Sequence, residues 1–272
     1  MCVSSNSFKL IKSLNNSSRN TRLLNTSFYS KSKPLKNLTV GHFSKNGRNG
    51  TIVVKHKGGG ASRCYRKVDF SRKSSGGLVI KYEYDPYRNP WILRIFHVDT
   101  HKHSYILGVK NLKLGIIVEN YESFKNGYHL YLKDLPAGYI IHNLSGSQTN
   151  KGTYLRSAGV FGILVIKTSK YARVKLRSGE HKYFSLKNSA SLGKVSNEES
   201  MFVKIGKAGR NRWKNIRPSV RGVAINPVDH PHGGGEGKTS GGRPSVSPWG
   251  KPVKGKPTVT NFKSCRLSIR KK

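Results

Sequence analysis

Apolar and polar residues alternate along most of the middle third of the chain. Residues 78–84 (LVIKYEY) and 91–98 (WILRIFHV) show the pattern on either side of a turn-like DPYRNP segment. Similar short runs follow at 104–109, 114–120, 129–135, 139–144, 162–168, 171–176 and 181–186, separated mostly by glycine or proline. Because successive side chains of a strand point to opposite faces, this alternation predicts β-strands.

The spacing of these runs predicts the class of fold. Short strands recur about every 8–12 residues, and hardly any segment shows the period of a helix. Such spacing is typical of small barrels or sandwiches. We therefore expect a mostly β fold made of two such units, divided near residues 125–135.

The two ends of the chain lack this alternation. Residues 31–62 and 204–272 are rich in glycine, proline, lysine and arginine, and poor in apolar positions. Segments of this composition do not bury enough apolar surface to fold alone. We interpret both as extensions without a core of their own that become ordered on a partner.

The charge of the chain indicates what that partner is. The 272 residues carry a formal net charge of +39; fourteen lysines and arginines but no acid precede Asp69, and seventeen basic residues after position 199 face only Asp229 and Glu236. Self-repulsion on this scale opposes compaction unless a polyanion neutralises it, and a phosphate backbone does so with release of counterions. A merely soluble basic protein and adsorption on anionic lipid are alternatives. Solvated surfaces normally intersperse both signs, so the pattern favours nucleic acid.

Other features exclude several classes of protein. Cys2, Cys64 and Cys265 are isolated and odd in number, which fits neither a zinc site nor a disulfide framework and suits a reducing compartment. The longest strongly apolar run, residues 160–166, is far too short to span a membrane, so no membrane segment is expected. Residues 1–30 are basic, serine-rich and free of acid, as in a mitochondrial presequence. A retained arm that orders on its partner is the alternative, and we favour retention.

The stretch NPVDHPHGGGEGKT (226–239) allows several kinds of chemistry. A phosphate loop is disfavoured because His232 stands where the first glycine of that pattern belongs, and the prolines that follow prevent the required helix. A metal site could use His230 and His232, which project on the same side of an extended backbone. A lone H-x-H in cationic surroundings, with only Asp229 and Glu236 nearby, more often makes hydrogen bonds than binds zinc.

Catalysis and RNA contact are the remaining interpretations of this stretch. Acids are too few for paired carboxylates, and no serine lies in G-x-S-x-G, which disfavours an autonomous enzyme. Glycines 233–235 lack the Cβ atoms that hold two backbones apart, so the chain could lie close against RNA. A second triplet, Gly58–Gly60, is framed by basic residues rather than by the serines of a flexible linker. Both triplets are interpreted as RNA-contacting elements.

A long segment, GKAGRNRWKNIRPSVRGVAINPVDHPHGGGEG (206–237), resembles the universal L-two family of large-subunit ribosomal proteins. The resemblance continues through KHKGGGASRCYRKVDF (55–70), KYEYDPYRNP (81–90), YILGVKNLKLG (105–115), LRSAG (155–159) and LRSGE (176–180), and so covers about 45–250. The run GGRPSVSPWGKP (241–252) is most similar to the mitochondrial branch. Residues 1–40, the segment 98–104 and the tail after Lys256 depart from the family pattern.

The resemblance implies an architecture for the whole chain. An OB-like RNA-binding barrel (63–127) is followed by an SH3-like barrel (128–203). A basic N-terminal extension (1–62) precedes the barrels, and a Gly/Pro/basic C-terminal extension (204–272) follows them.

The resemblance also implies a structural role in the large ribosomal subunit. The chain would bind and organise large-subunit rRNA near the peptidyl-transferase centre, touch neighbouring ribosomal proteins and reach the small subunit through a bridge contact. We expect no cofactor, metal, homo-oligomer or catalytic residue, with His230 in an organising role. The expected location is the mitochondrial matrix, ahead of a plastid or the bacterial cytoplasm. An RNA-processing enzyme that uses the His230/His232 loop is the alternative function.

The residues expected to contact RNA are basic, aromatic, glycine or histidine residues of these motifs, with one asparagine. They are Lys55, His56, Lys57, Gly58, Gly59, Gly60, Arg63, Arg66, Lys67, Arg156, Lys207, Arg210, Arg212, Trp213, Arg217, Arg221, Asn226, His230, His232, Gly233, Gly234, Gly235, Lys238, Arg243, Trp249 and Lys251.

Overall fold

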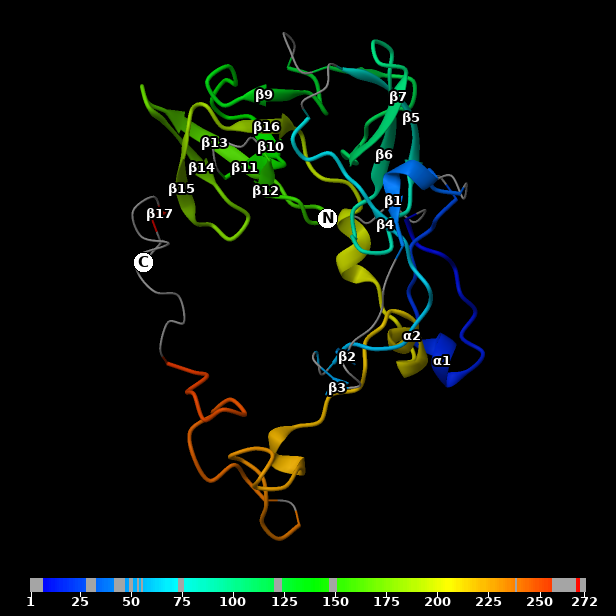
Figure 1. The fold of residues 1–272 in the computed structure, drawn as a ribbon, viewed down its shortest axis with the longest axis vertical. Helices are drawn as coiled ribbons and strands as arrows, with labels where there is room; N and C mark the ends of the chain where they lie inside the picture. Colours follow the sequence, from blue (N-terminus) through cyan, green and yellow to red (C-terminus); the bar gives the residue numbers. More distant parts are fainter. Residues whose placement is uncertain are drawn as a thin grey trace. The chain divides into compact units, whose positions relative to one another are not determined.

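The computed structural model of the chain describes residues 7–27, 33–41, 47–48, 51–52, 54, 56–72, 76–119, 124–146, 151–237, 239–255 and 268–269. The chain divides into two compact units. The first comprises Met1–Phe43, Ser62–Arg210 and Leu267–Lys272, and the second comprises Ser44–Ala61 and Asn211–Arg266. The first unit contains both large antiparallel sheets (Figure 1). The described chain is therefore mostly β, as the alternation of the sequence predicts.

The first sheet has four strands in the order β7-β6-β5-β8. Its strands are β5 (Gly77–Glu83), β6 (Ile92–His97), β7 (Lys102–Leu107) and β8 (Ile117–Val118). The predicted runs 78–84, 91–98 and 104–109 coincide with three of these strands, whereas 114–120 yields only the short β8. The register of β5 against β6 shifts between Val79 and Lys81, and such bulges increase the twist that curls a sheet towards a barrel.

The second sheet has seven strands in the order β17-β15-β14-β13-β10-β16-β9. Its strands are β9 (His129–Tyr131), β10 (Ile140–His142), β13 (Gly162–Lys167), β14 (Tyr171–Lys175), β15 (His181–Ser185), β16 (Ser189–Leu192) and β17 (Ser268–Ile269). The predicted run 139–144 is broken at Asn143, whose φ of 47° separates β10 from β11 (Leu144–Ser145). The latter pairs with β12 (Gly152–Tyr154), so this curled sheet and its side ribbon fit the expected second barrel.

Short elements complete the fold. Strand β1 (Thr39–Val40) pairs with β4 (Tyr65–Arg66), and β2 (Gly47–Arg48) pairs with β3 (Thr51–Ile52). The helical turns are α1 (Asn16–Arg19), η2 (Lys36–Leu38), η3 (Glu198–Phe202), α2 (Ala208–Trp213) and η4 (Gly222–Ala224). The sequence did not predict α2, because six residues are too few to show a helical period.

One hydrophobic cluster joins the interiors of the two sheets. It includes Leu93 and Ile95 of β6, Ile141 of β10 and Leu164 of β13, each at most 1% exposed. In the described part of residues 204–255, by contrast, none of the apolar side chains is buried. This confirms that the C-terminal extension lacks a core where the structure describes it.

His129 and His142 are two of the buried histidines of this first unit. The Nδ1 atom of His129 is 2.9 Å from the Ser191 hydroxyl, and Nδ1 of His142 donates to the carbonyl oxygen of Gly193 at 3.0 Å. Burial, helped by the charge of Arg72, lowers the pKa of His129 to about 3. Burial also lowers the pKa of His142 to about 4, although the hydrogen bond to Gly193 opposes this shift. Both imidazoles are therefore neutral in the folded protein at neutral pH.

The free energy of unfolding should decrease as the pH falls below about 6.5, the pKa of an unfolded histidine. The folded pKa values lie lower, so the unfolded chain binds more protons in the window from about pH 6.5 down to the folded values near 4 and 3. Because the unfolded chain binds a proton at each of these histidines, each should lower the free energy of unfolding by about 2 kcal/mol between pH 7 and pH 5.

Urea unfolding at a series of pH values measures this effect. His142→Asn keeps a donor near the Gly193 carbonyl and should reduce the pH dependence, while His103→Gln, at an exposed position, controls for the loss of one imidazole. Equal pH dependence in the wild type and His142→Asn would contradict the assignment of this effect to His142.

Candidate nucleic-acid interface

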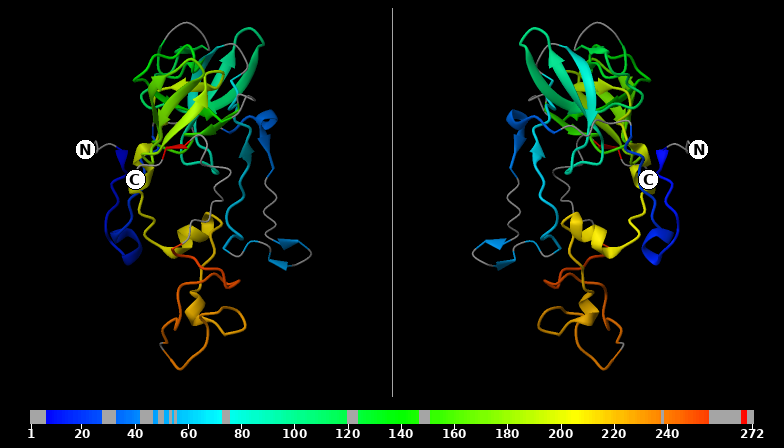
Figure 2. Two further views of the ribbon diagram at one scale, coloured as in Figure 1. Left: turned by 90° about the vertical axis from the view of Figure 1, so that its left-hand side faces the viewer. Right: turned by 90° about the vertical axis from the view of Figure 1, so that its right-hand side faces the viewer.

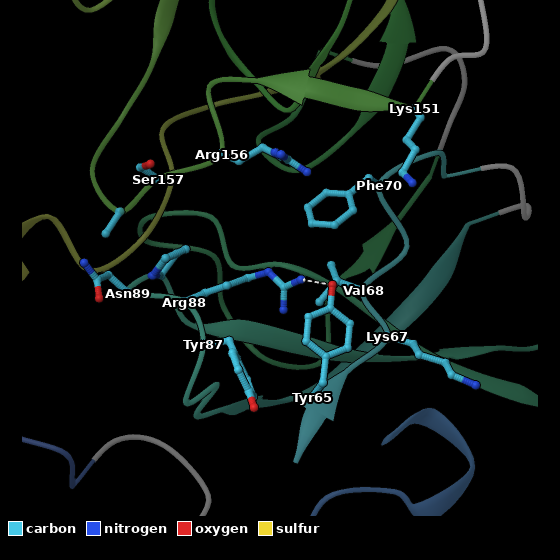
Figure 3. A pocket seen from close by; sticks show the side chains of 12 residues that line it. Tyr65, Lys67, Val68, Phe70, Tyr87, Arg88, Asn89, Lys151, Arg156 and Ser157 are labelled. Atoms are coloured by element: carbon cyan, nitrogen blue, oxygen red, sulfur yellow. Dashed lines mark hydrogen bonds between the residues drawn. The ribbon is translucent and has the colours of Figure 1, made fainter. Parts of the chain in front are cut away.

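A pocket of about 660 Å³ in the first unit combines aromatic and basic side chains. Strand β4, the turn after β5 and the loop after β12 supply its walls. The residues that matter for its chemistry are Tyr65, Lys67, Phe70, Tyr87, Arg88, Lys151 and Arg156 (Figure 3).

Two guanidinium groups lie against aromatic rings in this pocket. The Arg156 guanidinium is 4.7 Å from the centre of the Phe70 ring, and that of Arg88 is 5.5 Å from the same ring. Arg88 is also 4.9 Å from the centre of the Tyr65 ring and donates to the Tyr65 hydroxyl at 2.6 Å. Figure 3 shows both guanidinium groups beside Phe70. Planar guanidinium and aromatic faces of this kind can stack on unpaired bases.

The turn DPYRNP positions Arg88. Asp85 is 1% exposed; one of its carboxylate oxygens accepts the Tyr87 backbone N–H at 2.8 Å, and the other binds Arg88 Nη1 at 2.6 Å. A buried carboxylate that closes a turn and holds a guanidinium fixes the direction of the arginine side chain. Arg88 is thus held in place by the protein's own contacts.

Four of the residues predicted from sequence lie at or near this pocket. Lys67 and Arg156 line it, Arg63 lies 5.1 Å over the Tyr87 ring, and Arg66 donates to the Cys64 carbonyl at 2.7 Å. The sequence reasoning missed five further residues, namely Tyr65, Phe70, Tyr87, Arg88 and Lys151. The interleaving of tyrosine, phenylalanine and arginine in 63–70 and 84–88 was the available signal.

In the second unit, the first glycine triplet packs against the protein's own backbone. The Gly58 N–H donates to the Asn215 carbonyl at 3.2 Å, and Arg212 donates to the Gly58 carbonyl at 3.3 Å. A Cβ atom on Gly60 would lie 2.8 Å from the Asn215 nitrogen and 2.9 Å from the Trp213 oxygen. The partner that the structure shows for these glycines is therefore segment 211–217, and their predicted contact with RNA stays a prediction.

The second triplet closes a compact loop around His230. The Gly233 N–H donates to the His230 carbonyl at 2.9 Å, and the Gly234 N–H donates to the Ile225 carbonyl at 3.2 Å. A Cβ atom on Gly233 would lie 2.4 Å from the carbonyl oxygens of both Ile225 and Asn226. These glycines are needed for the loop to fold on itself.

The two histidines of this loop use ring nitrogens as acceptors. His230 is 9% exposed, and its Nδ1 accepts the backbone N–H of His232 at 3.0 Å. His232 Nε2 accepts the backbone N–H of Val246 at 3.2 Å. The rings lie 4.8 Å apart, in a turn rather than in the extended backbone assumed for a metal pair. Among the described residues, no group of three or more His, Cys, Asp or Glu side chains is placed to hold a metal ion.

The remaining predicted residues fall into three groups. Arg210 and Arg212 are half-buried, and their guanidinium groups donate to backbone carbonyls of Ile205, Gly58 and Ile216. Lys55 and Lys238 lie outside the described residues. Side chains exposed to solvent are those of His56, Lys57, Lys207, Trp213, Arg217, Arg221, Asn226, Arg243, Trp249 and Lys251, while Gly59 and Gly235 are exposed glycines.

No helix in the described part of the chain is long and apolar enough to cross a membrane.

Comparison with known proteins accounts for most of the chain. Residues 35–120 match the family model described as "Ribosomal Proteins L2, RNA binding N-terminal domain", and residues 125–250 match "Ribosomal Proteins L2, C-terminal domain". The chain is 45% identical over 248 residues to large ribosomal subunit protein uL2 of Rickettsia massiliae, covering 89% of this chain and 90% of that protein. It is also 45% identical over 270 residues to uL2 of Ehrlichia chaffeensis, covering 96% and 98%.

These relatives correct the location expected from the sequence. They are bacterial proteins, so they contradict the mitochondrial location and indicate a ribosome of bacterial type. The expectation rested on residues 1–30 and on the run 241–252. A basic, acid-free segment serves equally well as a presequence or as an RNA-binding arm, so composition alone does not separate the two.

The two family models and the relatives cover most of the chain and agree with its mostly β fold. The chain belongs to the ribosomal protein L2 family and is an RNA-binding structural constituent of the large ribosomal subunit.

Proposed function

We propose that this chain organises large-subunit rRNA near the peptidyl-transferase centre of a bacterial-type ribosome. It does so without catalysing a reaction itself, and it acts as a single copy. Its partners are the rRNA, neighbouring ribosomal proteins and, through a bridge contact, the small subunit. We also propose the division into extensions 1–62 and 204–272 around barrels 63–127 and 128–203.

The observation that carries the proposal is the pocket in which Arg88 and Arg156 lie against Phe70. Arginine and aromatic faces stack on bases, and Lys67 and Lys151, which also line the pocket, supply charges for phosphates. The family model over residues 35–120 is described as RNA binding and includes most of this pocket. A stacked, unpaired nucleotide with its phosphate on the lysines fits this combination.

The alternative, an RNA-processing enzyme that uses the His230/His232 loop, finds less support. A general base must present a ring nitrogen to the proton that it removes. His230 Nδ1 and His232 Nε2 already accept backbone N–H groups, and His230 is buried. These contacts support an organising role for both rings.

Replacing Arg156 by alanine should lower the affinity of the full chain for large-subunit rRNA by roughly 10-fold, because one stacking cation is lost. Filter binding at fixed salt measures this. Arg177→Ala is a matched control, since Arg177 is also exposed and lies 5.5 Å over the ring of Phe161 outside the pocket. Equal losses for both variants would argue against the pocket as an RNA site, and a wild type with no preference for rRNA over tRNA would argue against the function.

A further inference from the structure

The N-terminal segment forms a small hairpin. Phe8 and Leu24 are bridge partners, the Lys9 N–H donates to the Leu23 carbonyl at 2.9 Å, and the Asn25 N–H donates to the Ser7 carbonyl at 2.9 Å. Helix α1 lies at its closed end. We call residues 7–27, together with the segment 203–206 against which they pack, the clasp.

The hairpin is joined to residues 203–206 by backbone pairing. Arg22 and Lys204 form an antiparallel bridge, with N–H to carbonyl distances of 2.9 and 3.0 Å in the two directions. Gly206 has a φ of +81°, and a Cβ atom there would lie 1.9 Å from the Thr21 hydroxyl. Figure 2 shows the blue hairpin running beside the yellow segment that follows η3. The clasp is therefore closed by close contact between segments far apart in the sequence.

This pairing places two cations directly opposite each other. Side chains of directly opposed residues lie on the same face of a pair, and like charges in this position are destabilising. Both Arg22 and Lys204 are exposed, and the sequence of 7–27 and 203–206 contains no acid. The nearest acids in the sequence are Glu198 and Glu199 of η3. Glu198 is bound to Lys110 and Lys194, and among the described residues neither glutamate forms an ion pair with Arg22 or Lys204. Neutralisation must come from outside the clasp.

The aromatic ring of Phe8 lies beside the Arg22–Lys204 pair. The Arg22 guanidinium lies 4.7 Å over the centre of the half-buried Phe8 ring, which holds it in one place. Arg19, in the last turn of α1, adds a third exposed cation to the hairpin. A fixed guanidinium next to a lysine ammonium is suited to phosphate oxygens, which accept from both.

We propose that the clasp is a separate phosphate-binding site for rRNA, in which a phosphate backbone crosses the Arg22–Lys204 pair and holds the clasp closed. This inference rests on the proposed function, because it requires that the chain binds rRNA. Arg22 and Lys204 belong to no motif of the sequence. In this proposal the rRNA phosphate neutralises their opposed positive charges. Closure of the clasp and binding of RNA are thereby coupled.

Arg22→Glu tests the coupling in the full chain. Glutamate opposite Lys204 makes a favourable pair, so hydrogen exchange at the backbone N–H groups of residues 22 and 204 should slow in the free variant. Its affinity for large-subunit rRNA should nevertheless fall at least about 10-fold, because the phosphate meets a negative charge. A purely structural clasp predicts slower exchange with unchanged or better RNA binding, and that result would overturn the proposal.

The double variant Arg22→Gln/Lys204→Gln tests the phosphate contact by counting charges. The slope of log affinity against log salt should become shallower by about 2 units, and rRNA should no longer slow exchange in the clasp. Lys170→Gln/Lys187→Gln removes the same charge at exposed positions outside the clasp and should change the slope less. An equal change in both double variants would overturn the clasp site while leaving the proposed function intact. A wild type without salt-dependent rRNA binding would instead refute the proposed function.

Discussion

The affinity of the full chain for large-subunit rRNA should fall by about 10³–10⁵-fold between 50 and 200 mM monovalent salt. The net charge is +39, and its excess lies in the segments before Asp69 and after position 199. If roughly six to ten of these cations meet phosphates, each contact releases condensed counterions, and the release becomes less favourable as salt rises. Isolated barrels alone would not show so steep a dependence.

The measurement is equilibrium binding to rRNA transcripts at five or more salt concentrations. A fragment containing residues 70–200 is the comparison, since it keeps both large sheets apart from the two-residue β17 but loses most of the excess charge. We expect a markedly shallower slope for this fragment. A nearly flat salt dependence of the full chain would mean that the flanking charges do not meet phosphates.

Replacing Gly233 by valine should reduce incorporation of the chain into large subunits at least about 100-fold in competition with the wild type. Even the first carbon of a new side chain would lie 2.4 Å from the carbonyl oxygens of Ile225 and Asn226. Those atoms belong to backbone that also accepts the N–H groups of the loop, so they do not move aside cheaply. The loop would have to open, and the exposed residues around it would lose their positions.

Gly241→Ala is the matched control for this change. A Cβ atom at Gly241 would meet only ordinary contacts, at 3.8 Å from His232 and beyond, and the backbone there has no strained conformation. We expect near-normal incorporation of this variant, measured by mass spectrometry of purified subunits. Normal incorporation of Gly233→Val would show that the loop has room that the structure does not give it.

The sequence predicted the strands well wherever side chains alternate in size and polarity. It missed β16 (Ser189–Leu192), because four small or buried residues in a row show no alternation. It also missed the break between β10 and β11 at Asn143. That break depends on the positive φ of one residue, which the pattern of apolar and polar side chains does not reveal. These failures concern local geometry rather than the class of fold.

The candidate site was predictable only in part. Glycine triplets and basic residues stand out along the sequence, but whether a glycine approaches RNA or the chain's own backbone depends on tertiary structure. Gly60 against Asn215 is an example of the second case. The pocket around Phe70 joins segments more than eighty residues apart, and no short motif contains that information. The pairing of Arg22 with Lys204 is likewise visible only after folding.

The role of His230 distinguishes a structural function of this chain, the organisation of RNA, from a catalytic one. In the structure its Nδ1 accepts a backbone N–H, and its ring lies so close to Gly222 that a Cβ atom there would be 2.5 Å from Nδ1. A ring held in this way can fix the shape of the loop that we propose contacts RNA. Its loss should be felt in assembly more than in reaction rate.

The most direct measurement is single-turnover peptide transfer by purified large subunits that carry His230→Ala, normalised to the fraction of particles that contain the chain. The organising role predicts a rate within about 10-fold of the wild type once incorporation is taken into account. A loss of several orders of magnitude in fully assembled particles is the size expected for a missing general base. That result would contradict the conclusion that this chain organises RNA without taking part in the chemistry.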